Sequence, residues 1–307
     1  MTPVPTPHNL IPPQSMKTNR RSFLSSSFLG LTALSLPSAT SQAANPSLAQ
    51  QSAIKLGLVS YNLAKDWDVP TIIRNCSQTG FQGVELRTTH AHGVEVSLSA
   101  AQRKEIQHQF KDSPVELMGL GSAFDYHTTN PAKLKADVAA TKDYVVLAHD
   151  VGASGIKVRP NGLPEDKPVI ATLEQIGRSL REIGQFAADY GQQIRLEVHG
   201  AGTSFPPHIR TILDVADHPN VGACWNSNDT DLDGQGFEHN FNILKHKIFS
   251  VHMRDLSLTN YPFRKLLNHL NDLHYTGYCL AEIGSSSDPI RVMQYYRALF
   301  LAYQNLI

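Results

Sequence analysis

Charged and apolar residues alternate in the stretch from residue 193 to residue 199. It reads Gln-Ile-Arg-Leu-Glu-Val-His, so an extended strand here has its apolar side chains on one face and its charged side chains on the other. A strand with one face in solvent gives the same pattern. The stretch therefore indicates chemistry only if other strands of the chain repeat it.

Five further stretches repeat this alternation, and their polar residues fall near the C-terminal end of each stretch. Together with Arg195, Glu197 and His199, the residues on this face are Glu85, Arg87, Lys157, Arg159, Asn226, His252, Arg254 and Glu282. The C-terminal ends of the strands are where barrel enzymes place their active sites. We interpret this face as a functional site rather than a solvated surface.

Two carboxylates, an imidazole and an amide oxygen from this face form a suitable ligand set for one divalent cation. The residues are Glu197, Asn226, His252 and Glu282. The oxygen-rich balance favours Mn²⁺ first, then Mg²⁺, with Co²⁺ or Zn²⁺ as alternatives.

The alternative interpretation of the same face is an internal network of ion pairs without a metal. The positive partners available for it are Arg87, Lys157, Arg159, Arg195 and Arg254. With Glu85, Glu197 and Glu282, they give five positive and three negative charges. A polyhydroxylated or anionic small substrate would suit such a lining.

The elements that position these residues alternate between strand and helix after residue 52. Strands are expected at 54–61, 81–87, 115–121, 155–159, 193–199, 221–226, 248–254 and 278–283, with a helix after each. Alternation of this kind predicts a parallel sheet, and eight units predict an α/β fold of the closed (β/α)8 TIM barrel type over residues 53–307. An open doubly wound sheet is the alternative, but no glycine-rich phosphate loop follows the first strand.

Residues 1–44 have the order of an export signal. Arg20 and Arg21 precede a short apolar run at 28–36, and small residues up to Ala43 and Ala44 provide a cleavage site. The arginine pair resembles a Tat signal, which predicts a periplasmic or otherwise exported protein that meets the Tat translocase. A disordered tail with a chance arginine pair is the alternative. Translation is expected to start at Met16 rather than at Met1, and the apolar run is too short for a stable membrane span.

The composition is that of an ordinary globular domain. The chain has 307 residues, 41% hydrophobic and 18% charged, with a formal net charge of +0. That balance argues against a nucleic-acid partner. The cysteines Cys76, Cys224 and Cys279 are too widely spaced for a zinc cluster or a disulfide framework, so we expect them to be buried.

Short motifs in this order resemble the xylose isomerase-like TIM-barrel superfamily of sugar isomerases and epimerases, inosose dehydratases and endonuclease IV-type enzymes. They are the segments 83–86 (Gly-Val-Glu-Leu), 196–199 (Leu-Glu-Val-His), 224–228 (Cys-Trp-Asn-Ser-Asn), 251–255 (Val-His-Met-Arg-Asp) and 281–283 (Ala-Glu-Ile). The family binds its metal with Glu, Asp, His and Glu from strands five to eight. Asn226 stands where the family has Asp, so either it is a weak ligand, or Asp229 or Asp231 replaces it, or the metal is lost.

The resemblance implies an isomerase or epimerase that moves a proton next to a carbonyl. Glu197 and Glu282 would be the acid/base pair, while Arg254 and His199 would hold substrate oxygens. His127 on the rim would contact the substrate. The alternatives are a lyase or dehydratase acting on a keto-sugar or inosose, a carbohydrate-binding barrel without metal or catalysis, and a nuclease using His90, His92 and His127. Members of this family often pair, so a homo-oligomer is expected.

Overall fold

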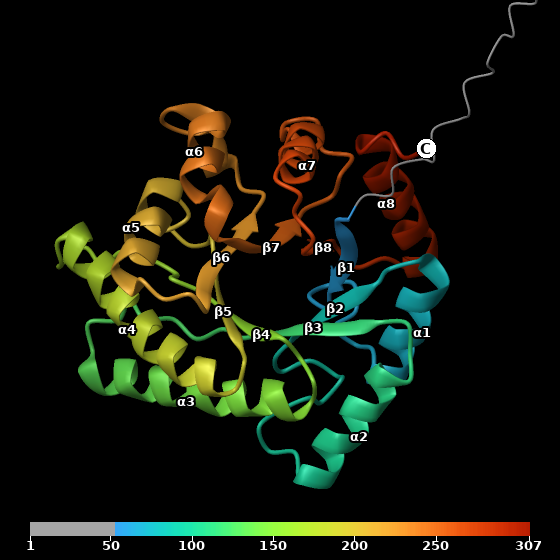
Figure 1. Cartoon of the computed structure of the whole chain (residues 1–307), viewed down its shortest axis with the longest axis horizontal. Coiled ribbons are helices and arrows are strands. Elements are labelled where there is room, and N and C mark those ends of the chain that lie inside the picture. The colour runs from blue at the N-terminus through green and yellow to red at the C-terminus, as the bar shows by residue number, and fades with distance from the viewer. Residues whose placement is uncertain (1–52) are drawn as a thin grey trace, which may run out of the picture. The chain divides into compact units, whose positions relative to one another are not determined.

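The strands of the protein close into a barrel. The computed structural model describes residues 53–307, in which eight parallel strands run in the order β1 to β8 and β8 pairs back with β1 (Figure 1). The strands are β1 (Lys55–Val59), β2 (Gly83–Arg87), β3 (Glu116–Gly121), β4 (Gly155–Val158), β5 (Gln193–Glu197), β6 (Val221–Asn226), β7 (Ile248–Met253) and β8 (Tyr278–Ala281). The predicted (β/α)8 TIM barrel is confirmed, and the open sheet is excluded. The predicted export signal lies outside the described residues.

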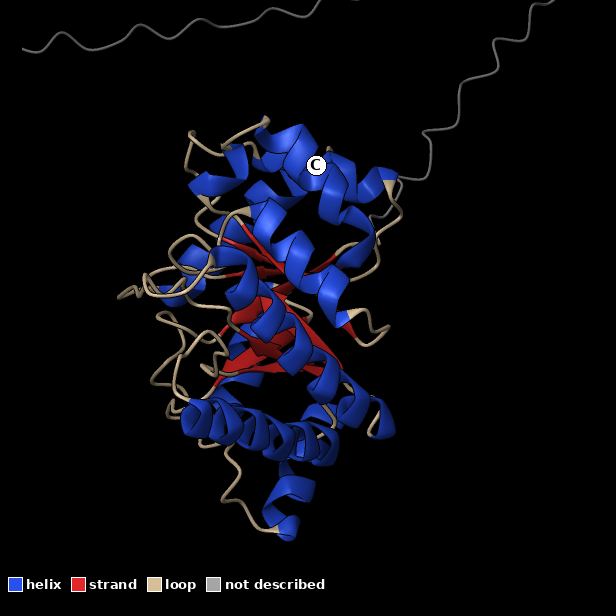
Figure 2. Ribbon diagram, turned by 90° about the vertical axis from the view of Figure 1, so that its left-hand side faces the viewer, coloured by secondary structure: helices blue, strands red, loops and turns tan. Residues whose placement is uncertain are grey.

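Helices follow the strands and pack around the outside of the barrel (Figures 1 and 2). They are α1 (Val69–Thr79), α2 (Ala100–Lys111), α3 (Pro131–Asp150), α4 (Val169–Asp189), α5 (Pro206–Ala216), α6 (Gly236–Leu244), α7 (Phe263–Asp272) and α8 (Pro289–Tyr303), with short 3-10 helices η1 (Asp229–Leu232) and η2 (Lys245–Lys247). Within residues 53–307, no helix is both long and apolar enough to cross a membrane.

Capping residues set where the helices begin and end. Asp68 accepts a hydrogen bond from the backbone N–H of Thr71 at the start of α1, and Gly80 ends that helix with φ 74°. Helix α2 begins at Ala100, because Ser99 and Gln102 form a capping box there. The observed bounds of β6 are the predicted ones.

The main core lies between the barrel wall and the layer of helices. Outward-facing strand residues such as Leu58, Val84 and Ile156 are fully buried there. The three cysteines are buried and free, as predicted. This packing fixes the outward face of each strand, so the alternate residues must point into the barrel.

Below the C-terminal ends of the strands, a compact layer that we call the floor closes the barrel interior. It consists of the apolar cluster Val59, Met118, Tyr278 and Leu280 together with Arg195. The Arg195 guanidinium donates to the Met118 carbonyl at 2.8 Å, to Ser154 Oγ at 2.8 Å and to Gln193 Oε1 at 3.0 Å. A Cβ at Gly119 would come within 2.7 Å of Arg195 Nη1, so the guanidinium lies in the space that a side chain at this position would take.

Candidate functional site

The C-terminal ends of the strands surround a cavity of about 330 Å³, which we call the mouth. Its lining residues are Val59, Tyr61, Asn62, Arg87, Lys157, Arg159, Glu197, His199, Asn226, Asn228, Arg254 and Glu282. All the predicted site residues line it except Glu85, His127 and His252. A larger groove of about 830 Å³ runs outside the barrel along α8, but it contains none of the predicted site residues.

Three acidic or imidazole side chains from different strands meet at the base of the mouth. Glu197 ends β5, His252 lies on β7, and Glu282 directly follows β8. His252 Nδ1 lies 3.7 Å from Glu197 Oε1 and 3.7 Å from Glu282 Oε2. One nitrogen therefore faces two carboxylates at the same point of the site.

Glu85 lies beneath this group rather than in the mouth. It is fully buried, and its Oε1 is 3.3 Å from Nε2 of His252, on the side of the ring opposite Nδ1. A Cβ at Gly121 would come within 2.7 Å of the same Glu85 oxygen, so the glycine on β3 gives the carboxylate its space. The structure places Glu85 behind the imidazole, and its predicted contact with the substrate remains a prediction.

Lys157 and Asn226 both contact Glu197. Lys157 Nζ lies 2.6 Å from Glu197 Oε2, and both side chains are nearly inaccessible to solvent. Asn226 Nδ2 donates to the other oxygen, Glu197 Oε1, at 3.3 Å. The ammonium of Lys157 thus occupies one carboxylate oxygen and leaves Oε1 directed toward His252.

The pKa values of the two glutamates of the mouth are shifted in opposite directions. Burial alone would raise the pKa of Glu197, but the charge of Lys157 and the contacts with His252 hold it well below its usual range. Burial raises the pKa of Glu282, and the negative charge of Glu197 adds to this shift although His252 opposes it. Two carboxylates whose pKa values are pushed apart are suited to act as base and acid.

A divalent cation fits among these atoms. Ligands bound about 2.1 Å from one ion lie about 3 to 4 Å apart, and donor atoms of Glu197, His252 and Glu282 lie within 4.8 Å of one another. Neither ring nitrogen of His252 makes a well-aligned hydrogen bond to a described residue. Glu197 Oε1, His252 Nδ1 and Glu282 Oε2 are the atoms that would hold the ion.

The loop after β6 does not supply a replacement carboxylate for Asn226. Asp229 Oδ1 pairs with Arg254 Nη2 at 2.8 Å. Asp231 is buried, and its Oδ2 accepts a hydrogen bond of 2.6 Å from the Tyr261 hydroxyl, which in turn accepts one of 2.9 Å from Trp225 Nε1. Asn226 is therefore the only residue of the three in a position to be a fourth ligand, and it becomes one if its amide turns its oxygen toward the site.

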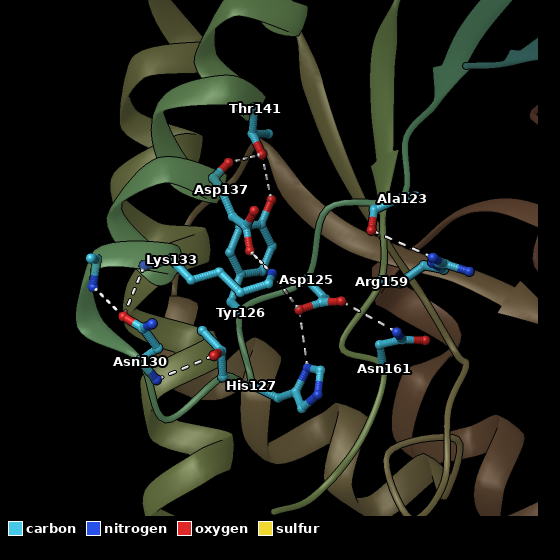
Figure 3. A network of polar contacts seen from close by, with 12 residues as sticks. Ala123, Asp125, Tyr126, His127, Asn130, Lys133, Asp137, Thr141, Arg159 and Asn161 are labelled. Atoms are coloured by element: carbon cyan, nitrogen blue, oxygen red, sulfur yellow. Dashed lines mark hydrogen bonds and ion pairs between the residues drawn. The ribbon is translucent and has the colours of Figure 1, made fainter. Parts of the chain in front are cut away.

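His127 lies in a polar cluster beside the mouth. Its Nδ1 is 3.2 Å from Asp125 Oδ1, while Asn161 donates to Asp125 Oδ2 at 3.3 Å (Figure 3). Figure 3 shows the guanidinium of Arg159 pointing away from this cluster, with a contact of 3.4 Å to the Ala123 carbonyl. His127 does not line the mouth. Its contact with the substrate remains a prediction.

The two other rim histidines are held by local contacts. His92 lies 2.7 Å from the Arg87 carbonyl through Nε2 and accepts from the Val94 N–H through Nδ1, so both ring nitrogens are engaged by the backbone. His90 Nδ1 lies 3.3 Å from Ser60 Oγ, and its ring stacks on Tyr61. Neither is placed to complete a metal cluster with Glu197, His252 and Glu282.

The sequence did not reveal two asparagines of the mouth. Asn62 follows β1 and Asn228 follows β6, and both line the cavity. Asn228 donates to the Val198 carbonyl, so its side chain also joins the loops after β5 and β6. Their signal was weak because loop residues follow no alternation; only their place just after a strand could have marked them.

Residues 73–299 match the family described as "Xylose isomerase-like TIM barrel". This match covers most of the chain, and the chain belongs to that family. No curated protein sequence matches it.

Solved structures with the same fold include several sugar epimerases. An L-ribulose 3-epimerase superposes with a TM-score of 0.70 at 14% identity, covering 82% of this chain and 95% of that one. The 3-keto-D-glucoside 4-epimerase YcjR from E. coli gives 0.67 at 16% identity, covering 82% and 99%. An IolI protein with a bound zinc atom gives 0.64 at 18% identity, covering 81% and 98%. At these identities the likeness shows the fold alone.

Proposed function

We propose that this protein is a sugar isomerase or epimerase that moves a proton next to a carbonyl group. The observation that carries the proposal is the pair of glutamates in the mouth, whose carboxylates face the same imidazole nitrogen. The epimerase structures with the same fold support a sugar as the substrate.

Glu197 is the base of this proposal. Its pKa is low and Lys157 fixes one of its oxygens, so it is ionised and directed toward the substrate. It takes the proton from the hydroxyl-bearing carbon beside the carbonyl; the electron pair of that C–H bond forms the new C=C bond, and the π pair of the C=O bond moves to the oxygen to give an enediolate. Glu282 returns a proton to the opposite face or to the neighbouring carbon. His199 and Arg254 line the same cavity and would hold other substrate oxygens.

A divalent cation held by Glu197, His252 and Glu282 would supply Lewis-acid polarisation of the substrate oxygens. Asn226 contributes no charge, so we expect weaker affinity than a site with a third carboxylate would give. Mn²⁺ remains our first choice, and the zinc atom in the IolI structure shows that this fold accepts a divalent ion.

The test combines elemental analysis with proton exchange. The mature protein is purified without added metal, its metal content is measured, and it is incubated in D₂O with a panel of ketoses, aldoses and keto-glycosides. We expect about one divalent ion per chain, deuterium at a carbon beside the carbonyl, and loss of both after chelation. A product lighter by one water would identify a dehydratase instead. Metal-free protein whose sugar affinity ignores chelators would identify a binding barrel.

We also propose that the protein is exported through the Tat pathway. Folding before export would let the cytoplasm load the ion before the chain meets competing zinc or copper. Changing Arg20 and Arg21 together to Lys should leave the precursor inside the cell, as followed by fractionation. Normal export of that variant would refute the signal.

A further inference from the structure

The charge of the mouth is unbalanced. Its lining holds four positive side chains and two negative ones, so the positive side chains exceed the negative by two. A bound divalent cation would increase this excess. Such a lining disfavours a cationic ligand and attracts an anionic one.

Two of the four positive side chains already have carboxylate partners. Lys157 is paired with Glu197 at 2.6 Å, and Arg254 is paired with Asp229 at 2.8 Å on the rim. Arg87 and Arg159 differ from them: within residues 53–307, neither forms an ion pair. Arg87 Nη1 donates to the Thr88 carbonyl at 2.9 Å, and Arg159 Nη2 has only a long contact of 3.4 Å with the Ala123 carbonyl.

Arg159 is the less satisfied of these two arginines. Its Nε is buried and has no hydrogen-bond partner among the described residues. A buried guanidinium N–H without a partner costs free energy, so it is expected to meet a ligand that accepts hydrogen bonds. The fork of a guanidinium matches the two oxygens of a carboxylate or phosphate.

The positive side chains gather on one side of the mouth. Arg87 on β2 pairs in register with Gly121 on β3, and Gly121 pairs in register with Lys157 on β4. Strand β3 lies between them, so the backbones of Arg87 and Lys157 are two strand spacings, or about 10 Å, apart, and the Glu85 carboxylate takes the space that a side chain at Gly121 would fill. Arg159 follows β4 on the same side. We call Arg87, Lys157 and Arg159 the cationic wall.

The groups that would hold the ion and move the proton lie on the other side of the mouth. Glu197, His252 and Glu282 belong to β5, β7 and β8. A ligand that spans the mouth would therefore meet the ion and the acid/base pair at one end and Arg87 and Arg159 at the other, while Lys157 of the cationic wall also contacts Glu197. A cavity of about 330 Å³ is at the small end of ligand sites, which suits one sugar unit.

We infer that the substrate is a sugar carrying an anionic group, a carboxylate or a phosphate, which Arg87 and Arg159 bind on the cationic wall while the carbonyl end lies against Glu197 and Glu282. This inference rests on the proposed function for the reacting end of the ligand. The cationic wall itself is independent of which reaction follows.

Three sugars that differ only at one terminal carbon test the inference. D-glucose, D-glucuronate and D-glucose 6-phosphate are titrated by calorimetry into the protein as purified. The same titrations are run with fructose, fructuronate and fructose 6-phosphate. We expect at least one anionic sugar to bind about tenfold or more tightly than its neutral counterpart, as expected for a charge-assisted hydrogen bond. The preferred anion distinguishes a carboxylate from a phosphate.

Variants show whether the cationic wall causes that preference. Arg159→Gln and Arg87→Gln should each reduce the preference for the anionic sugar about tenfold and leave the affinity for the neutral sugar nearly unchanged. Arg178→Gln, which removes an exposed arginine on α4, is the matched control and should change neither. Titration after chelation separates binding by the wall from binding by the ion.

Two results would overturn the inference: equal affinity for neutral and anionic sugars throughout the panel, or equal losses for both in Arg159→Gln. The proposed function fails separately. If anionic sugars bind through the arginines but no proton exchange occurs in D₂O, the wall stands and the isomerase does not. If a neutral sugar is converted and no anionic sugar is preferred, the proposed function stands and the inference about the cationic wall fails.

Discussion

The floor and the mouth of the barrel are built from the same strands but treat their polar groups differently. In the floor, the charged side chain of Arg195 donates to Met118, Ser154 and Gln193, so its buried guanidinium is well satisfied. At the base of the mouth and beneath it, both ring nitrogens of His252 and the carboxylate oxygens of Glu85 are buried without a well-aligned hydrogen bond to any described residue.

This contrast separates stability from function. Buried polar groups are nearly always hydrogen-bonded, because leaving one unpaired costs about 1 to 3 kcal/mol. The guanidinium of Arg195 is engaged by the protein itself, whereas neither ring nitrogen of His252 is. The groups in the mouth are thus available for a ligand, whereas the floor holds the strands together.

The largest effect is expected from the acid/base pair. Glu282→Gln keeps the shape of the side chain but cannot carry the proton, so kcat/KM should fall about 10²- to 10⁴-fold, with little loss of unfolding free energy. Activity is followed by deuterium exchange and stability by denaturant unfolding. Glu116→Gln, at the opposite end of the barrel, is the control and should keep its activity. Retained activity in Glu282→Gln would refute the acid/base assignment.

Replacing the buried cation of the floor should act on stability instead. Arg195→Met removes the donors that satisfy Met118, Ser154 and Gln193, and also a positive neighbour of Glu85. We expect a loss of about 3 kcal/mol or more in unfolding free energy, since breaking a buried charged network leaves its partners unpaired. Chemical denaturation measures this loss. A change below about 1 kcal/mol would show that the floor does not depend on Arg195.

Glu85 lies between the floor and the mouth. Its replacement tests whether it supports the candidate metal site or only the stability of the floor. If Glu85 holds His252 by Nε2 so that Nδ1 faces the ion, Glu85→Gln should weaken metal affinity about 10- to 100-fold. Competition with a chromogenic chelator measures that affinity without any assay of turnover. Glu174→Gln on α4 is the matched control. Unchanged metal affinity would assign Glu85 to the floor.

The smallest effect is expected at the bottom of the barrel. The Tyr278 hydroxyl lies 2.8 Å from Glu116 Oε2 and 3.2 Å from the Gln82 carbonyl. Tyr278→Phe removes both contacts and should cost about 1 kcal/mol of unfolding free energy, measured by thermal and chemical unfolding. Its activity should equal that of the native protein. A tenfold loss of activity would show that the floor and the mouth are coupled.

The alternation of side chains along strands made much of the site predictable. Glu197, His252 and Glu282 point inward because their neighbours Leu196, Val251 and Ala281 are held in the outer core. The depth of each side chain in the barrel was not predictable, because alternation assigns a side chain to one face of its strand but does not identify the residues that it contacts. Glu85 and Arg87 share one face of β2, yet the first lies beneath His252 and the second lines the cavity.

The alternation of side chains along strands did not predict the positions of loop residues. His127 was expected in the site but pairs with Asp125 beside it. His199 was placed in the fifth strand, which in fact ends at Glu197, yet it still lines the mouth because the chain turns only at Gly200 (φ 93°). The carboxylate partner of Lys157 could not be predicted from the sequence either. Glu197 lies forty residues further along the chain, and only the folded barrel brings the two side chains together.

The hydrogen bond between Trp225 and Tyr261 gives the protein an optical reporter of its own. Trp225 is one of two tryptophans in the chain, is fully buried, and directly precedes Asn226. The ring of Tyr261 lies 5.7 Å from the guanidinium carbon of Arg254, which lines the mouth. A ligand that draws Arg254 inward changes the electric field at the indole, so the emission of Trp225 would report occupancy of the mouth without a label.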